Sequence, residues 1–179
     1  MKNIEIKKYQ IFSFIFTIIL GTVLHFTYDW SGHNDIVGTF SAINESTWEH
    51  LKLLFYPMLL TSIIGYFYIG KKVPNLVCSK TIGILVAIAF TVIFFYTYTG
   101  VLGKNIALID ISSFFIATIL GEFVAYILMI NRFKCNNIMA IIVLIIVGIS
   151  FVVFTFNAPN IGLFKDPITG KYGIMKNFI

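Results

Sequence analysis

Charged residues are scarce in this chain. They make up 12% of its 179 residues, whereas 58% are hydrophobic; a soluble domain carries about 25% charged residues. This composition excludes a soluble globular protein, because the chain lacks the polar surface needed to cover itself in water. The net charge of +5 is small and scattered, so nucleic acid is not an expected partner. The expected partner is the lipid bilayer, with the apolar runs as membrane spans.

Cysteine is also rare. The two cysteines, Cys78 and Cys135, are far apart in the sequence and form no C-x-x-C motif. Both fall in segments that the charge pattern described below places in the cytoplasm, where thiols stay reduced. We therefore expect no disulfide between them.

Long apolar runs are what the chain has instead. Each is close to the ~20 residues that an α-helix needs to cross the hydrocarbon layer. The sequence therefore predicts an all-α bundle of five transmembrane helices, with residues 1–179 forming one domain. The expected spans are residues 9–26, 50–69, 81–99, 106–130 and 138–156. Residues 27–49 then form a loop and residues 157–179 a tail or lid, both on the same side of the membrane.

Basic residues predict the orientation of these spans. Eight of the thirteen lie at alternate ends of the spans: Lys2, Lys7, Lys8, Lys71, Lys72, Lys80, Arg132 and Lys134. The other five are Lys52, Lys104, Lys165, Lys171 and Lys176. Loops rich in Lys and Arg stay in the cytoplasm, so the N-terminus is expected inside and the C-terminus outside. The loop at residues 27–49, the turn at residues 100–105 and the tail then share the outer face.

Acidic and histidine side chains gather in the first outer loop and at its borders. Seven of the eleven Asp, Glu and His residues lie between His25 and His50. Titratable groups near a membrane are costly to keep, so such a cluster usually has a function. At the start of this cluster, His25 and Asp29 share one face of the first helix with Gly21, because the three residues are spaced four positions apart. An imidazole one turn from a carboxylate suits metal binding or proton transfer.

The start of the second span admits two interpretations. Ser46 and Glu49 fit a capping box, in which the hydroxyl and the carboxylate each accept a hydrogen bond from an amide of the first turn. In the other interpretation, Glu49 acts in a site with Glu45 and His50. Asp110 begins the small-residue face of the fourth span at the same depth, so we expect it to face the same outer cavity.

These residue types suit two kinds of chemistry. Imidazole and carboxylate groups bind divalent metals such as zinc, and they also act as general acids and bases. The candidate metal ligands are His25, Asp29, Glu45 and His50. The candidate catalytic residues are Glu49, His50, Asp110 and Tyr98. The spacing matches no standard metal motif, so a bound divalent metal is a hypothesis from composition alone.

Three blocks of sequence are similar to those of a known family. They read LHFTYDWSGHN running into NESTWEHLKLLFYP, then YTYTGVLGKNIALIDISSFF, then FNAPNIGLFKDPITGKYGI. Together they resemble a family of small, uncharacterised bacterial integral membrane proteins with a domain of unknown function. The resemblance covers nearly the whole chain and implies a multi-pass protein of the bacterial inner membrane. It implies no activity, substrate or cofactor.

The leading functional hypothesis is a membrane enzyme that hydrolyses a lipid or another membrane-proximal substrate. A metal-bound water or a Glu–His general base would carry the reaction. One alternative is a small proton-coupled transporter with Asp110 and Glu122 as stages on its path. The other is a non-catalytic assembly or partner protein whose polar cluster locks the helices and tail together. Most of the acids and histidines are expected at one depth, as in the site of an enzyme. A transporter would need polar groups across the whole membrane, and only Glu122 lies deep.

Overall fold

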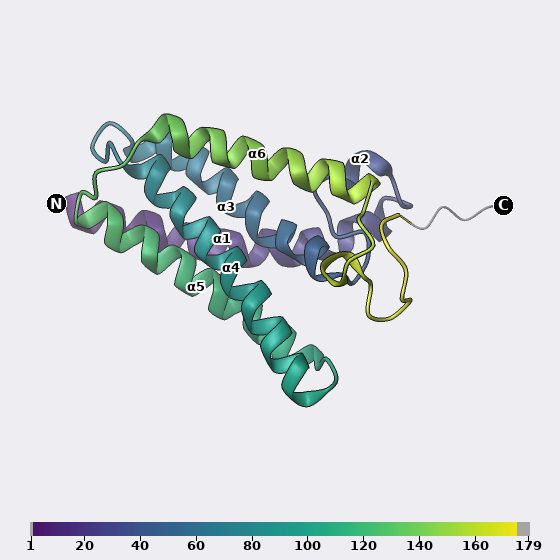
Figure 1. Cartoon of the computed structure of the whole chain (residues 1–179). Coiled ribbons are helices and arrows are strands. Elements are labelled where there is room, and N and C mark those ends of the chain that lie inside the picture. Colours follow the sequence, from purple (N-terminus) through teal and green to yellow (C-terminus); the bar gives the residue numbers. More distant parts are fainter. Residues whose placement is uncertain (1, 175–179) are drawn as a thin grey trace.

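The chain folds into an all-α bundle, which confirms the expected fold class (Figure 1). The structure is a computed structural model that describes residues 2–174. Five helices in that part of the chain are long and apolar enough to cross a membrane. They are α1 (Lys2–Trp30), α3 (Thr47–Ile69), α4 (Leu76–Leu102), α5 (Ala107–Ile130) and α6 (Asn137–Phe156). Met1 and the last part of the expected tail, residues 175–179, lie outside the described residues.

The helices extend beyond the apolar runs that predict them. α1 and α4 reach several residues past the expected spans at both ends. Apolarity marks only the stretch that lies in hydrocarbon, whereas backbone hydrogen bonding continues into the polar flanks. Two short helices that the sequence does not predict are α2 (Asp35–Gly38), in the loop after α1, and the 3₁₀ helix η1 (Gly162–Phe164), in the tail. The start of α2 is fixed by Asn34, whose side-chain oxygen accepts from the amides of Ile36 and Val37.

The connections between the long helices alternate between the two ends of the bundle (Figure 1). The start of α1, the α3–α4 turn and the α5–α6 turn lie at one end, here named the N-terminal end. The segment with α2, the α4–α5 turn and the tail after α6 lie toward the other end, here named the tail end. The α4–α5 turn points away from the ends of the other long helices. An odd number of spans thus puts the start of α1 and the tail on opposite sides of a membrane.

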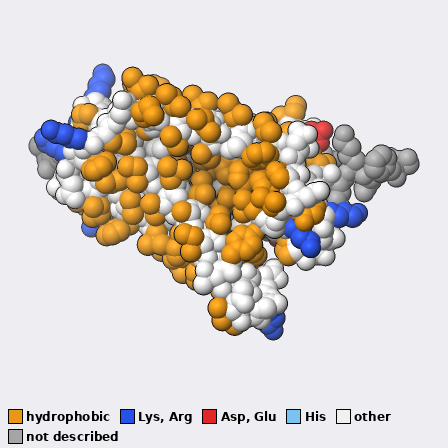
Figure 2. All heavy atoms as spheres, viewed as in Figure 1, with side chains coloured by type: hydrophobic (Ala, Val, Ile, Leu, Met, Phe, Trp, Pro, Cys, Tyr) orange, Lys and Arg blue, Asp and Glu red, His pale blue; other side chains and the backbone are white. Residues whose placement is uncertain are grey.

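The outside of the bundle is apolar. Hydrophobic side chains cover the face shown in Figure 2, and Lys and Arg side chains gather toward its ends. Ile15, Phe67 and Ile145, from three different helices, are 49%, 80% and 54% exposed. In water a continuous apolar surface of this kind promotes aggregation, whereas in a bilayer it contacts acyl chains. The chain is therefore a multi-pass membrane protein.

Small residues let α4 and α5 pack closely. Gly83 and Gly121 face each other, and a Cβ atom placed on Gly121 would lie only 2.7 Å from the carbonyl oxygen of Gly83. Ala87 and Ala125, both fully buried, border this contact. The small-residue face expected on the fourth span is thus confirmed as a helix-packing face.

A buried ion pair joins α4 to α5 and α1 toward the N-terminal end. The ammonium of Lys80 lies 2.6 Å from a carboxylate oxygen of Glu122, and both side chains are buried. The hydroxyl of Ser13 donates to the same carboxylate and accepts from Lys80, each over 2.7 Å. Lys80 therefore lies inside the bundle rather than in the loop where the apolar pattern predicts it, and it adds no charge to the surface.

Cys78 and Cys135 form a disulfide with Cα atoms 6.3 Å apart, so the expectation of two separate thiols is wrong. The pairing follows from how the helix ends meet. Asn75, just before α4, donates to the carbonyls of Leu128 and Phe133 at the end of α5. These bonds bring the start of α4 next to the α5–α6 turn, although the two cysteines are 57 positions apart in the sequence.

Candidate metal site

Three titratable side chains converge at the tail end. His25 projects from α1, Glu45 from the loop before α3, and His50 from the first turn of α3. The Nε2 atoms of the two histidines are 3.2 Å apart. Carboxylate oxygens of Glu45 lie 3.4 Å from Nε2 of His50 and 3.9 Å from Nε2 of His25. The structure therefore brings together three of the four candidate metal ligands, with ligand atoms within 4.8 Å of one another.

The start of α3 fixes the orientation of His50. Ser46 is the N-cap of this helix, and its hydroxyl accepts from the amide of Glu49. The carbonyl oxygen of Ser46 lies 2.9 Å from Nδ1 of His50. A carbonyl only accepts hydrogen bonds, so Nδ1 carries the proton and Nε2 is directed at Glu45 and His25. Metal-binding histidines are typically held in this way by a hydrogen bond from the second ring nitrogen.

The spacing of the three groups is close to that around a tetrahedral zinc ion. Zn–N bonds of about 2.0–2.1 Å put two ligand nitrogens about 3.3 Å apart at the tetrahedral angle. The two Nε2 atoms are separated by 3.2 Å, and Glu45 and His50 by 3.4 Å. The 3.9 Å between Glu45 and His25 is longer than that value. Three protein ligands would leave a fourth position for water or substrate.

Glu45 supplies the negative charge of the cluster. A hydrogen bond from His50 holds the pKa of the Glu45 carboxyl below its usual range, against the opposing effect of burial. The carboxyl is therefore ionised at neutral pH, as a metal ligand must be. Without a metal, His50 carries a second proton on Nε2, beside the one on Nδ1, and donates it to this carboxylate. A bound metal would replace the proton on Nε2. The Glu45 side chain is 42% exposed and each histidine 32%, so solvent reaches the cluster.

Asp29, the fourth candidate ligand, lies outside the cluster. Its carboxylate is 3.1 Å from Nε2 of His33, and the two side chains are 73% and 66% exposed. Asp29 lies one helical turn beyond His25, near the end of α1, and the turn that follows brings His33 back to it. This pair is on the surface of the loop.

Glu49 points into the protein instead of toward the histidines. Its carboxylate lies 2.5 Å from the ammonium of Lys52, and the side chains are 3% and 0% exposed. The carboxylate also accepts from the amide of Ile43 and the hydroxyl of Thr155. Lys52 in turn donates to the carbonyl of Gly38 over 2.7 Å. Glu49 is thus part of a buried ion pair that ties α3 to the loop and to α6.

Only half of the predicted capping box forms. The hydroxyl of Ser46 accepts from the amide of Glu49 as expected. The amide of Ser46, however, donates to the side chain of Asn44 rather than to Glu49. The carboxylate is held elsewhere because Lys52 is buried beside it. Lys52 thereby leaves the set of surface cations, as Lys80 does.

Tyr98 and Asp110 form a pair on α4 and α5. The hydroxyl of Tyr98 donates to the carboxylate of Asp110 and accepts from the amide of Ile106. Neither residue is part of the group formed by His25, Glu45 and His50.

The tail folds against the same end of the bundle. Phe164 of η1 is buried, and its ring lies 4.8 Å from that of Trp48 and 5.4 Å from that of Phe154. Farther along, the side chain of Asn44 donates to the carbonyl of Gly173 over 3.1 Å. Asn44 directly precedes Glu45, so the described part of the tail packs on the loop that carries a candidate ligand.

Fold and cluster together define a class of protein: a multi-pass helical membrane protein with a His–His–Glu cluster at one end of its bundle. Residues 1–174 match the family described as Family of unknown function (DUF6512), and the chain belongs to this family. That result confirms the resemblance of the three sequence blocks to an uncharacterised family. No curated protein and no solved structure matches the chain.

The sequence interpretation did not identify the lysine partners of two buried acids, Glu49 and Glu122. Lys52 is three positions after Glu49, a spacing at which helical side chains meet, so the sequence alone could have predicted this pair. The pairing of Lys80 with Glu122 is harder to predict. It lies on the same face of α4 as Gly83 and Ala87, the residues that pack against α5, and this face leads to Glu122.

Proposed function

We propose that this protein is a membrane hydrolase that holds a divalent metal ion, with zinc as the best fit, between His25, Glu45 and His50. The observation that carries the proposal is the convergence of three ligand atoms, from two helices and a loop, within 4.8 Å of one another. The Ser46 carbonyl supports it, because it leaves Nε2 of His50 directed at the other two groups. Two imidazoles and one carboxylate are a known ligand set of catalytic zinc.

The proposed reaction is attack by a metal-bound water on an ester or phosphoester bond of a membrane-proximal substrate. A zinc ion held by these residues would lower the pKa of its bound water to about 7 and so would supply a hydroxide nucleophile at neutral pH. The exposure of the three ligands, 32% for each histidine and 42% for Glu45, gives that water access. A position at the end of the helices suits a substrate whose reacting bond lies at the level of lipid headgroups.

Tyr98 and Asp110 serve the reaction from the opposite helix pair in this proposal. For this role the Tyr98 hydroxyl, which donates its one proton to Asp110 in the structure, would turn to the leaving group or to the oxyanion that develops in the transition state. Glu49 is left out of the catalytic set, because Lys52 and Thr155 occupy its carboxylate. It acts as a positioning residue for the first turn of α3.

A proton-coupled carrier has less support. It would need polar groups that continue from Glu122, near the N-terminal end, to His25. At Gly21, one turn before His25, a Cβ atom would lie 2.6 Å from the backbone oxygen of Leu53 and 2.7 Å from the ring of Phe114. These contacts fill the face of α1 between the two polar regions.

We also propose that the protein lies in the cell membrane with its N-terminal end in the cytoplasm and its metal site outside. With the buried Lys52 and Lys80 set aside, eleven of the thirteen basic residues remain. Seven of these eleven belong to the N-terminal end, and the more positive end of a membrane protein stays inside.

Metal analysis of the purified, detergent-solubilised protein tests the site. We expect about one zinc, iron or manganese ion per chain, lost in His50→Ala and in Glu45→Gln because each removes one of three ligands. His33→Ala is the matched control, since His33 is in the same loop and pairs with Asp29; this variant should keep the metal. Equal metal content in all three variants, or none in the wild type after incubation with zinc, would contradict the proposal.

The reaction is tested with the zinc-loaded protein in vesicles of phospholipid. Release of fatty acid or of a soluble headgroup should require zinc, stop in Glu45→Gln and persist in His33→Ala. Tyr98→Phe should lower the rate by about 100-fold or more without loss of zinc, because it removes one proton donor. Full zinc occupancy with no hydrolysis of any vesicle lipid would contradict lipid hydrolysis and favour the assembly alternative.

A further inference from the structure

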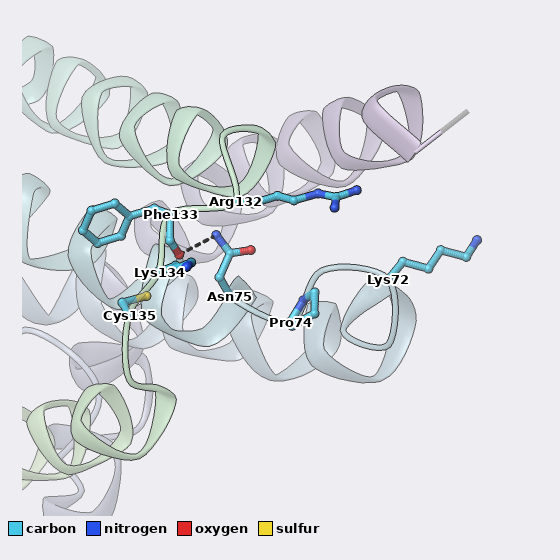
Figure 3. A pocket seen from close by; sticks show the side chains of 7 residues that line it. All are labelled: Lys72, Pro74, Asn75, Arg132, Phe133, Lys134 and Cys135. Atoms are coloured by element: carbon cyan, nitrogen blue, oxygen red, sulfur yellow. Dashed lines mark hydrogen bonds between the residues drawn. The ribbon is translucent and has the colours of Figure 1, made fainter.

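A second polar site lies at the N-terminal end, on the opposite side of the molecule from the metal site. A hollow of about 390 Å³ separates the α3–α4 turn from the α5–α6 turn. Its lining includes Lys72 and Asn75 from the first turn and Arg132, Lys134 and Cys135 from the second (Figure 3). None of the described residues that line it is acidic. The hollow is thus a basic site of small-molecule size.

Among the described residues, two of its three cations have no acidic partner. Lys72 is paired with Glu5, over 2.7 Å. Within residues 2–174, neither Arg132 nor Lys134 forms an ion pair. Figure 3 shows the side chains of Arg132 and Lys72 extending from the two turns on the same side of the hollow. Positive charge that is not neutralised within the protein attracts an anion from outside it.

The walls of the hollow are tied together before any ligand binds. Asn75 donates to the carbonyls of Leu128 and Phe133, which joins the α3–α4 turn to the end of α5 (Figure 3 draws the second of these bonds). The disulfide between Cys78 and Cys135 makes a second connection between the same elements. A site whose walls are already in place loses little conformational freedom on binding.

We propose that this hollow binds the phosphate group of an anionic phospholipid in the leaflet at the N-terminal end. Guanidinium and ammonium groups donate to phosphate oxygens with charge-assisted hydrogen bonds. The hollow lies where α3, α4, α5 and α6 end or begin, which in a bilayer is the level of the headgroups. Basic pockets between spanning helices at this level bind anionic headgroups. Phe133, next to Arg132 and 47% exposed, offers apolar surface to the acyl chain of the same lipid.

Native mass spectrometry of the full-length protein in detergent, titrated with phosphatidylglycerol or phosphatidylcholine, tests this site. The protein should bind phosphatidylglycerol more tightly. The double variant Arg132→Gln with Lys134→Gln should bind it about thirtyfold more weakly, from about fivefold for each cation near an anionic headgroup. Lys104→Gln with Lys171→Gln is the matched control, because it removes the same charge from exposed positions at the tail end; it should bind as the wild type does. Equal affinity for the two lipids, or unchanged affinity in the first double variant, would overturn the proposal.

Two further measurements separate a lipid site from a folding defect and from a site for free phosphate. Lys134→Gln alone should weaken binding about fivefold, and it keeps the proposal testable if the double variant fails to fold. Inorganic phosphate at millimolar concentration distinguishes the source of the anion. Failure to displace phosphatidylglycerol supports a lipid ligand, whereas full displacement would overturn the lipid assignment in favour of free phosphate. None of these outcomes depends on the metal site.

Discussion

Glu45 and Glu49 are the same residue type four positions apart, and the start of α3 separates their surroundings. Glu45 lies before the N-cap Ser46, in the loop, where its carboxylate meets two imidazoles. Glu49 lies in the first turn of the helix, where its carboxylate meets Lys52 and Thr155. A buried carboxylate is tolerated only with a partner. One acid therefore remains free for ligand chemistry, while the other stabilises the fold.

Replacing Glu49 with glutamine should destabilise the protein without removing the metal. Glu49→Gln leaves the ammonium of Lys52, which is 0% exposed, without a counter-charge. Removal of one partner from a buried ion pair costs about 3–5 kcal/mol of unfolding free energy. Thermal unfolding in detergent should therefore occur at a clearly lower temperature, while the zinc content stays at the wild-type level.

Two variants serve as controls for that experiment. Glu45→Gln should lose zinc but keep its metal-free stability within about 1 kcal/mol, because the Glu45 side chain is partly exposed, at 42%, and its replacement leaves no buried charge unpaired. Glu49→Gln combined with Lys52→Met should regain much of the lost stability, because both buried charges are then gone. Loss of zinc in Glu49→Gln at normal stability would instead place Glu49 in the metal site.

At the scale of helices, the contact between α4 and α5 leaves no room for a side chain at Gly83. In Gly83→Ala the new methyl would overlap the backbone oxygen of Gly121, so the two helices must move apart. Such overpacking costs about 1–3 kcal/mol, and the unfolding temperature in detergent should fall. Gly148→Ala is the control on α6, where the nearest atoms are 3.6 Å away. If Gly83→Ala is as stable as this control, the close contact of α4 and α5 is wrong.

The packing of the tail against the bundle can be measured by the fluorescence of Trp48. Phe164 lies against Trp48, with ring centroids 4.8 Å apart. In a Trp30→Phe background, which leaves Trp48 as the sole tryptophan, Phe164→Ala should shift the fluorescence emission to the red and increase quenching by iodide, because water gains access to the indole. Ile168→Ala, at a position that is 77% exposed, should change neither. Identical spectra in the two variants would mean that the tail does not cover Trp48.

Apolar length predicts the helices of this protein well, but it does not predict which side chains pair. All five expected spans coincide with long helices, because the need for about 20 apolar residues is a property of each segment alone. Lys80 is an example of a side-chain pairing that apolar length does not predict. The expected span begins at Thr81, whereas α4 begins at Leu76, so Lys80 enters the bundle. Its partner Glu122 is 42 positions away in the sequence, and no local pattern encodes such a contact.

Part of the histidine cluster could be predicted from the sequence. His25 and His50 lie on helices that are joined by one loop, so connectivity alone brings both to the same end of the bundle. Helical spacing, however, puts His25 and Asp29 on the same face of the helix, so it could not show that only His25 joins the cluster. The difference arises one turn beyond His25, where Asp29 meets His33 at the surface, a contact made by the irregular turn after α1.

At the scale of the whole molecule, the two ends differ in chemistry. The tail end carries the cluster of His25, Glu45 and His50, and the tail folds over part of that end. The N-terminal end carries the basic hollow around Arg132 and Lys134. The apolar length of the bundle separates them, so the lipid proposed at one end and the bond proposed to be cleaved at the other would belong to opposite leaflets.

Two properties of the N-terminal end point to opposite orientations. With the buried Lys52 and Lys80 set aside, seven of the remaining eleven basic residues belong to this end, which predicts that it faces the cytoplasm. The disulfide between Cys78 and Cys135 at the same end is typical of an oxidising compartment. Charge acts on every chain during insertion, whereas a disulfide depends on the redox conditions that the folded protein meets afterward. Charge therefore decides the orientation.

Single cysteines test this orientation. In a background of Cys78→Ser and Cys135→Ser, Thr169→Cys should react with a membrane-impermeant maleimide in intact cells, because this exposed tail position faces outward. Lys134→Cys, equally exposed, should react only after the membrane is permeabilised. Labelling of Lys134→Cys in intact cells would reverse the orientation: the candidate metal site would then face the cytoplasm, and the disulfide between Cys78 and Cys135 would lie on the outer side.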